Sequence, residues 1–68
     1  MTNTELLKEI IDRSGFKLQY LAQALGISRF ALNNKIENRS QFKSGEIKAL
    51  CGLLGIESLS EKERIFFA

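Results

Sequence analysis

Apolar residues recur at helical spacing along this whole 68-residue chain, and no stretch alternates between apolar and polar residues as a strand would. The chain contains no proline, so nothing in it forbids helical backbone. These two features predict an all-α fold, a compact bundle of about five short helices. With 44% hydrophobic residues the chain is long enough for one core and too short for two, so we expect a single domain over residues 1–68.

Capping signals predict the limits of the first two helices. Thr2 and Glu5 have the spacing of a capping box, and the apolar stripe that follows them stops at Ser14-Gly15. A second helix is predicted over residues 17–25. Gly26 follows it and can leave the helix through a left-handed conformation.

The next two helices are predicted in the same way. Ser28 can cap a third helix that runs toward Glu37. The loop after it contains Phe42, which we expect to anchor the loop in the core. Ser44 can cap a fourth helix, which Gly55 closes.

A short fifth helix is predicted from the capping-box spacing of Ser60 and Glu63. It places three apolar residues, Ile65-Phe66-Phe67, near the end of the chain, and they cannot all face inward from one short helix. We expect one phenylalanine to be buried and the other to be available for a protein interface. The alternative is that both simply cap the core.

The turn between the second and third predicted helices is the most informative feature. A helix-turn-helix needs a small residue where the helices cross, a residue that tolerates positive φ in the turn, and apolar residues that fix the crossing angle. The chain has all of these in order: Ala22, Gly26, Ile27, Leu32 and Ile36. The pattern predicts a helix-turn-helix over residues 18–38, with an αα corner that binds no nucleic acid as the alternative.

Charge is concentrated in the same part of the chain. Residues 14–43 carry a net charge of +4, whereas residues 1–13 and 44–68 carry −1 each. A basic centre of this kind suits a polyanion, although an ordinary solvated surface would have the same composition.

The composition argues against catalysis and against export. The chain has no histidine, no glycine-rich phosphate loop and no second cysteine beside Cys51, so we expect no enzyme, no cofactor and no metal site. Cys51 is expected to be a small core residue. No apolar run approaches the ~20 residues that span a bilayer, and Glu5 and Glu9 replace the basic start of a signal peptide. We therefore expect a soluble, cytoplasmic protein with no membrane partner.

The run Leu21-Ala22-Gln23-Ala24-Leu25-Gly26-Ile27-Ser28 resembles the hallmark of Cro/repressor-like (XRE family) helix-turn-helix proteins. Residues 35–43, Glu46-Ile47 and residues 61–68 are similar to small Cro-like regulators of phages of Gram-positive bacteria. The resemblance implies a lambda-repressor-like domain that binds double-stranded operator DNA and regulates transcription. Family members commonly have Gln at the position of Leu18, where it helps to hold a phosphate; Gln19 would substitute for it if the helix began differently.

The resemblance maps the base-contacting positions onto Ser28, Arg29, Phe30, Asn33 and Asn34. Helical geometry agrees, because these residues lie away from Leu32 and Ile36, which are expected to point inward. Arginine can pair with guanine, asparagine with adenine and phenylalanine with a thymine methyl group, and each good bidentate pair contributes ~1–3 kcal/mol of discrimination. The alternative for the two asparagines is that they only solvate the helix.

Basic and polar residues that flank this face are predicted to contact phosphates. They are Lys17, Gln19, Lys35, Arg39, Ser40 and Lys43. For Lys35 the alternative is that it offsets the negative end of the third helix.

Two kinds of partner follow from this interpretation. The first is operator DNA, on which the C-terminal aromatic residues would allow a homodimer with half-sites about 34 Å apart. The second is a cognate repressor protein, which the chain would bind as an antirepressor.

Overall fold

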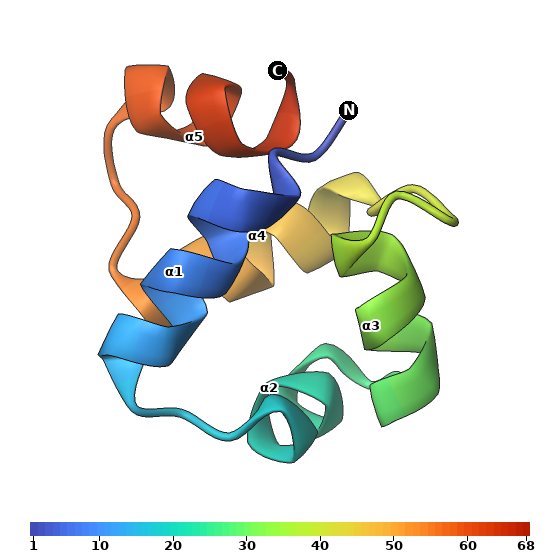
Figure 1. Cartoon of the computed structure of the whole chain (residues 1–68). Helices are drawn as coiled ribbons and strands as arrows, with labels where there is room; N and C mark the ends of the chain where they lie inside the picture. The colour runs from blue at the N-terminus through green and yellow to red at the C-terminus, as the bar shows by residue number, and fades with distance from the viewer.

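The computed structural model describes residues 1–68 as five α-helices with no strand, as the periodicity predicted. The helices surround a central core, with α5 at one end and α2 and α3 at the other (Figure 1). The radius of gyration is 10.6 Å, close to the ~11 Å of a compact chain of this length. The helices are α1 (Thr4–Ser14), α2 (Leu18–Leu25), α3 (Arg29–Ile36), α4 (Ser44–Leu54) and α5 (Leu59–Phe66).

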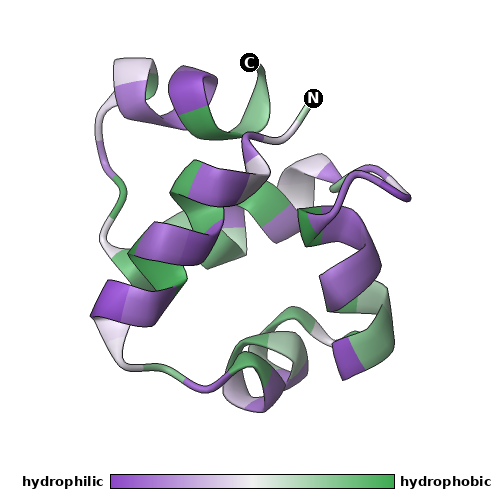
Figure 2. Cartoon of the chain, viewed as in Figure 1, coloured by the Kyte–Doolittle hydropathy of each residue, from purple (hydrophilic) through white to green (hydrophobic).

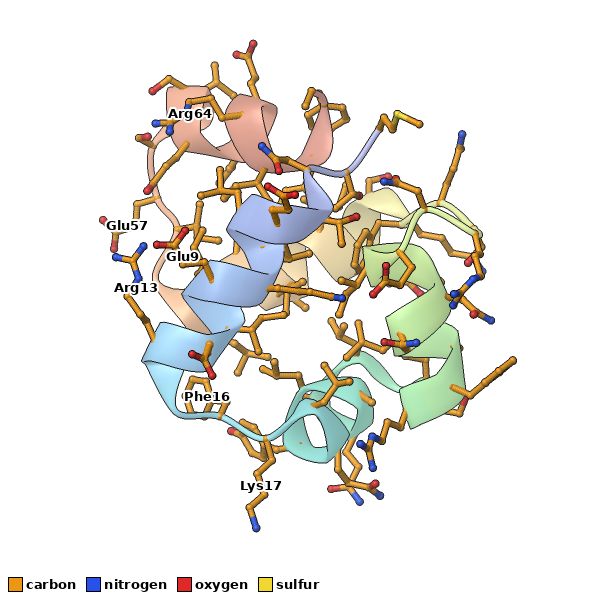
Figure 3. The ribbon with its side chains drawn as sticks, viewed as in Figure 1. Glu9, Arg13, Phe16, Lys17, Glu57 and Arg64 are labelled. Atoms are coloured by element: carbon orange, nitrogen blue, oxygen red, sulfur yellow. The ribbon has the colours of Figure 1, made fainter.

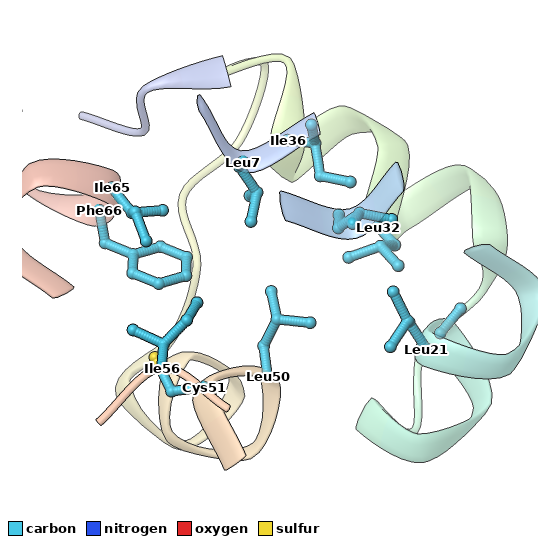
Figure 4. Packing of buried hydrophobic residues seen from close by; sticks show 11 residues of the cluster. Leu7, Leu21, Leu32, Ile36, Leu50, Cys51, Ile56, Ile65 and Phe66 are labelled. Atoms are coloured by element: carbon cyan, nitrogen blue, oxygen red, sulfur yellow. The ribbon is translucent and has the colours of Figure 1, made fainter. Parts of the chain in front are cut away.

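Every helix contributes two residues to one hydrophobic core, and Ile56 joins them from the loop after α4 (Figure 4). Its members are Leu7, Ile11, Leu21, Ala22, Leu32, Ile36, Leu50, Cys51, Ile56, Ile65 and Phe66. Cys51 is a free, buried thiol, as expected, and burial raises its pKa. Phe42 is half-buried and meets the ring of Phe66 edge-on, with 5.5 Å between the ring centroids. This contact confirms the prediction that Phe42 anchors the loop between α3 and α4.

Three predicted helix starts were wrong. Asn3 caps α1 in place of Thr2, because the Asn3 side chain accepts from the Leu6 amide at 3.2 Å. Ser58 caps α5 in place of Ser60, accepting from the Glu61 amide at 3.1 Å. Ser44 is the first residue of α4 and does not cap it. At each start several polar residues lie close together, and each predicted cap is only one or two residues from the observed one.

The predicted helix stops and the cap of α3 are confirmed. Gly15, Gly26 and Gly55 follow α1, α2 and α4 in the left-handed conformation, with φ between 72° and 77°. The Ser28 hydroxyl accepts from the Ala31 amide at 3.0 Å and so caps α3. The end of α2 and the start of α3 are therefore set by Gly26 and Ser28, as the sequence indicated, whereas α2 begins at Leu18 and not at the predicted residue 17.

The two ends of the chain lie side by side at the α5 end of the molecule (Figure 1). The Asn3 amide donates to the Ile65 carbonyl at 2.6 Å, and the Ala68 amide donates to the Met1 carbonyl at 3.0 Å. Asn38, in the left-handed conformation after α3, holds the other side of the N-terminal segment. Its side chain accepts from the Thr2 amide at 2.9 Å and donates to the Thr2 carbonyl at 2.7 Å. We call these contacts of residues 1–3 with Ile65, Ala68 and Asn38 the terminal seam.

Candidate nucleic-acid interface

Helices α2 and α3 are joined by a turn of three residues and cross steeply, so that Figure 1 shows α2 nearly end-on while α3 runs up the view. Within the turn, the Gly26 amide donates to the Gln23 carbonyl and the Ile27 amide to the Ala22 carbonyl, both at 3.0 Å. Ala22 of α2 and Leu32 of α3 are both buried in the core. Gly26 therefore provides the left-handed turn and these two residues are buried, as the sequence pattern predicted, while the helix-turn-helix itself stays a prediction.

Helix α3 has an apolar inner side and a polar outer side. Leu32 and Ile36 face the core, whereas hydrophilic residues cover much of the visible length of the helix (Figure 2). Arg29 and Phe30 are exposed, and Phe30 stands out with 75% of its surface accessible. A large apolar side chain held out from the first turn of a helix is available to a partner.

The five predicted base-contacting residues have three different surroundings. Arg29, Phe30 and Asn33 line a shallow hollow of about 370 Å³, which they share with Leu18 of α2. Asn34 lies apart from them, and its side-chain oxygen accepts from the Arg39 guanidinium at 3.4 Å. Ser28 uses its hydroxyl oxygen to cap α3.

Leu18 also lines this hollow, whereas the sequence analysis considered it only as the position where the resembling family carries a phosphate-holding Gln. It is the first residue of α2, is half-buried, packs on the core and forms the apolar wall of the hollow beside Phe30. Its place on the apolar stripe of α2 was the available signal. Gln19, the next residue, is exposed on α2.

Most of the predicted phosphate-contacting residues are exposed around the ends of α2 and α3. Lys17 precedes α2, and its side chain points away from the fold into solvent (Figure 3). Arg39, Ser40 and Lys43 are exposed in the segment that leads from α3 to α4. Arrays of this kind suit the backbone of a nucleic acid, which is contacted by lysine, arginine and hydroxyl groups alike.

The prediction for Lys35 needs correction. This residue is buried, with 8% of its surface accessible, and its ammonium group donates to Glu46 of α4 at 2.5 Å. A lysine held by a carboxylate inside the fold is not available for a phosphate. Lys35 does lie in the last turn of α3, as the alternative of offsetting the negative helix end requires, but its ammonium group is bound by a side chain of the next helix.

Two acidic residues near α3 are each paired with a lysine. Asp12 of α1, which lines a hollow with Asn33, is in no ion pair. Glu37 pairs with Lys8 of α1, and the hydrogen bond from Lys8 holds the pKa of Glu37 below its ordinary value. The hydrogen bond from Lys35, followed by that from the backbone of Lys43, likewise lowers the pKa of Glu46. Both carboxylates are therefore charged and engaged at neutral pH.

Four cations around α3 have no acidic partner. The three ion pairs of the molecule are Lys8–Glu37, Arg13–Glu9 and Lys35–Glu46. None of them includes Lys17, Arg29, Arg39 or Lys43. Four of the five cations of residues 14–43 are therefore without an ion pair, as are Lys48, Lys62 and Arg64 elsewhere in the chain.

No group of three or more His, Cys, Asp or Glu side chains gathers at any place in the structure, and no helix is long and apolar enough to cross a membrane. Comparisons with known protein families, with curated proteins and with solved structures find no match to this chain.

Proposed function

We propose that this chain is a sequence-specific DNA-binding regulator of transcription, of the Cro/repressor type, in which α2 and α3 form a helix-turn-helix. In this proposal α3 lies in the major groove of operator DNA, and α2 with the segment before α4 contacts the phosphates. The observation that carries the proposal is the set of four cations without an ion pair on and around α3, where Glu37 and Glu46 are each paired with a lysine.

The contacts are assigned by chemistry. Arg29 can donate twice to guanine, and Asn33 and Asn34 can pair with adenine. The hollow between Phe30 and Leu18 offers an apolar seat for a thymine methyl group. Lys17, Arg39 and Lys43 contact phosphates through their charges, and Gln19 and Ser40 contact them as neutral donors. Ser28, at the start of α3, is assigned to the bases.

A homodimer on DNA is part of the proposal. Phe67 is 65% exposed, whereas its neighbour Phe66 is buried, so one C-terminal phenylalanine is free as expected. Phe67 borders a hollow of about 410 Å³ that no charged side chain lines. The lining residues are Met1, Thr2, Asn38, Ser40, Gln41, Phe42, Ile47, Phe66 and Phe67. Two copies joined at this edge would read half-sites about 34 Å apart.

The test is selection of duplexes from a random DNA pool at physiological salt, followed by binding measurements over a salt series. We expect one enriched sequence with two spaced half-sites, and an affinity that falls steeply with salt because each phosphate contact releases counterions. Binding that does not depend on salt contradicts the proposal. If no duplex is enriched and the chain instead co-elutes with a repressor, the antirepressor function replaces it.

Two substitutions separate base reading from phosphate binding. Asn34→Ala is expected to reduce discrimination at one base pair by about 5- to 150-fold, since one good bidentate contact contributes ~1–3 kcal/mol. Lys43→Ala is expected to weaken selected and scrambled duplexes alike and to reduce the salt slope by about 1. Equal effects of the two substitutions on every duplex would contradict this assignment of roles.

A further inference from the structure

One oxygen atom joins two parts of the candidate interface. Glu46 Oε1 accepts from Lys35 Nζ at 2.5 Å and from the backbone amide of Lys43 at 2.8 Å. Lys35 lies in the last turn of α3, and Lys43 ends the segment that exposes Arg39 and Ser40. The carboxylate of Glu46 therefore connects the helix that carries the proposed base contacts with the segment that carries the proposed phosphate contacts.

This link is better shielded from water than the other two ion pairs. The Lys35 and Glu46 side chains are 10% and 11% exposed, whereas Lys8 and Glu37 are 56% and 27% exposed. The Glu9 and Arg13 side chains are more exposed still. A shielded pair with a second hydrogen bond on the same oxygen holds its geometry more firmly than an exposed one, which salt and side-chain motion weaken.

We propose that Glu46 is a positioning residue for DNA discrimination, which holds the α3 face in a fixed relation to residues 39–43. The inference rests on the proposed function. Phosphate contacts fix the register of a protein on a duplex, and base contacts read the sequence within that register. Loosening the link lowers discrimination although no base-contacting side chain is changed.

The sign of the effect separates positioning from plain electrostatics. Glu46 is an anion close to the proposed DNA surface, so removal of its charge reduces repulsion of every duplex. On charge alone, Glu46→Gln would strengthen binding to selected and scrambled duplexes equally. Positioning requires the opposite for the selected duplex, because Lys35 then has a neutral amide oxygen in place of its anionic partner, and the link between α3 and α4 weakens.

The experiment compares the affinity of Glu46→Gln for the selected duplex and for a scrambled duplex of equal composition. It is run at a temperature where circular dichroism shows the variant to be fully folded. We expect the ratio of the two affinities to fall about tenfold, comparable to the loss of one good base contact. We expect the affinity for the scrambled duplex to stay equal or to rise.

Glu57→Gln is the matched control, because it removes the same charge from an exposed residue in the loop between α4 and α5. Figure 3 shows Glu57 on the opposite side of the molecule from α3. Its affinity ratio should equal that of the wild type. A fall in the control as large as that in Glu46→Gln overturns the proposal.

Lys35→Met is the second variant, and it decides the question if Glu46→Gln does not fold. It keeps the aliphatic stem and leaves Glu46 free to accept from the Lys43 amide. A reduced affinity ratio, with hydrogen-exchange protection of the Lys43 amide retained, supports positioning of α3 by the pair. If the wild type discriminates and both folded variants keep its ratio, the positioning role is overturned while the proposed function stands; if the wild type selects no sequence, the proposed function itself fails.

Discussion

At the scale of single residues, the hydrogen bonds of Glu46 make the stability of the fold depend on pH. Its carboxylate accepts two hydrogen bonds on one oxygen, and the bond from Lys35 contributes most to lowering its pKa. A carboxyl group whose pKa is lower in the folded chain than in the unfolded chain stabilises the fold while it is ionised. That contribution is complete above the unfolded pKa and is lost as the pH falls through the folded pKa.

The pH dependence of stability tests this assignment. We expect Glu46→Gln to reduce the free energy of unfolding by on the order of 2 kcal/mol at neutral pH, since it leaves a shielded ammonium without its anion. The difference from the wild type should shrink as the pH falls below about 4.3, the ordinary pKa of glutamate. Urea unfolding of both proteins between neutral and acidic pH measures it. A difference that stays constant over this range would show that ionisation of Glu46 is not the cause.

Lys35 shows where inference from the sequence ends for the site. Its basic charge and its place late in α3 predicted a phosphate contact, but its partner lies 11 residues further along, in another helix. No local spacing rule, such as the i,i+4 pairing of Arg13 with Glu9, predicts such a pair. Arg29 and Phe30 were placed correctly as exposed residues because their positions depend only on the period of α3.

At the scale of helices, stops were predicted better than starts. A helix stop at Gly15, Gly26 or Gly55 requires positive φ, which glycine adopts without strain, so the residue type identifies the position. A helix start accepts any of several short polar residues, and Asn3 competes with Thr2 on nearly equal terms. Spacing rules therefore left each start uncertain by one or two residues.

Two glycine substitutions, one inside a helix and one at a helix end, should change stability in opposite directions. Gly52 lies exposed within α4, and a Cβ added there meets nothing within 4 Å, so Gly52→Ala should stabilise the fold by about 0.5–1 kcal/mol. Gly26 also has open space around it, but its φ is 74°, and Gly26→Ala should cost about 1–2 kcal/mol. Thermal unfolding measures both. Equal shifts in Tm would mean that backbone conformation does not decide the outcome at these sites.

At the scale of the whole molecule, the fold is closed by the terminal seam. The Asn38 side chain makes two hydrogen bonds with the backbone of Thr2 and a third, at 3.3 Å, with the Thr4 hydroxyl. Thr4 in turn donates to the Ile36 carbonyl at the end of α3 at 2.6 Å. The N-terminal segment therefore helps to fix the end of α3, on which the proposed reading face depends.

The seam can be weakened in two steps. Asn38→Gly removes the side-chain hydrogen bonds, but glycine adopts the φ of 64° without strain. We expect the free energy of unfolding to fall by about 1–2 kcal/mol. Asn38→Ala removes the same bonds and adds the strain of a left-handed conformation, for about 1 kcal/mol more. Chemical denaturation should rank the wild type above Asn38→Gly and Asn38→Gly above Asn38→Ala. A reversed order of the two variants would place the main role of Asn38 elsewhere than in the seam.

The distribution of charge also belongs to the whole molecule. The net charge of +2 is small, yet Glu37 and Glu46 near α3 are paired and four cations there are not. In the proposed function, these four cations would attract a polyanion to this surface. The segment charges of the sequence did not distinguish Lys35, which is paired, from the cations that are not.

The contact between the two chain ends means that the chain could be circularly permuted. Because the Ala68 amide already touches the Met1 carbonyl, a short glycine-serine linker could join the ends without stretching α1 or α5. New ends could then be opened in the exposed loop around Glu57. In such a circular permutant the polypeptide would begin at α5 and finish with α4, while α2, its turn and α3 remained continuous. The proposed DNA-binding surface could then be studied on a chain whose ends lie in the loop between α4 and α5.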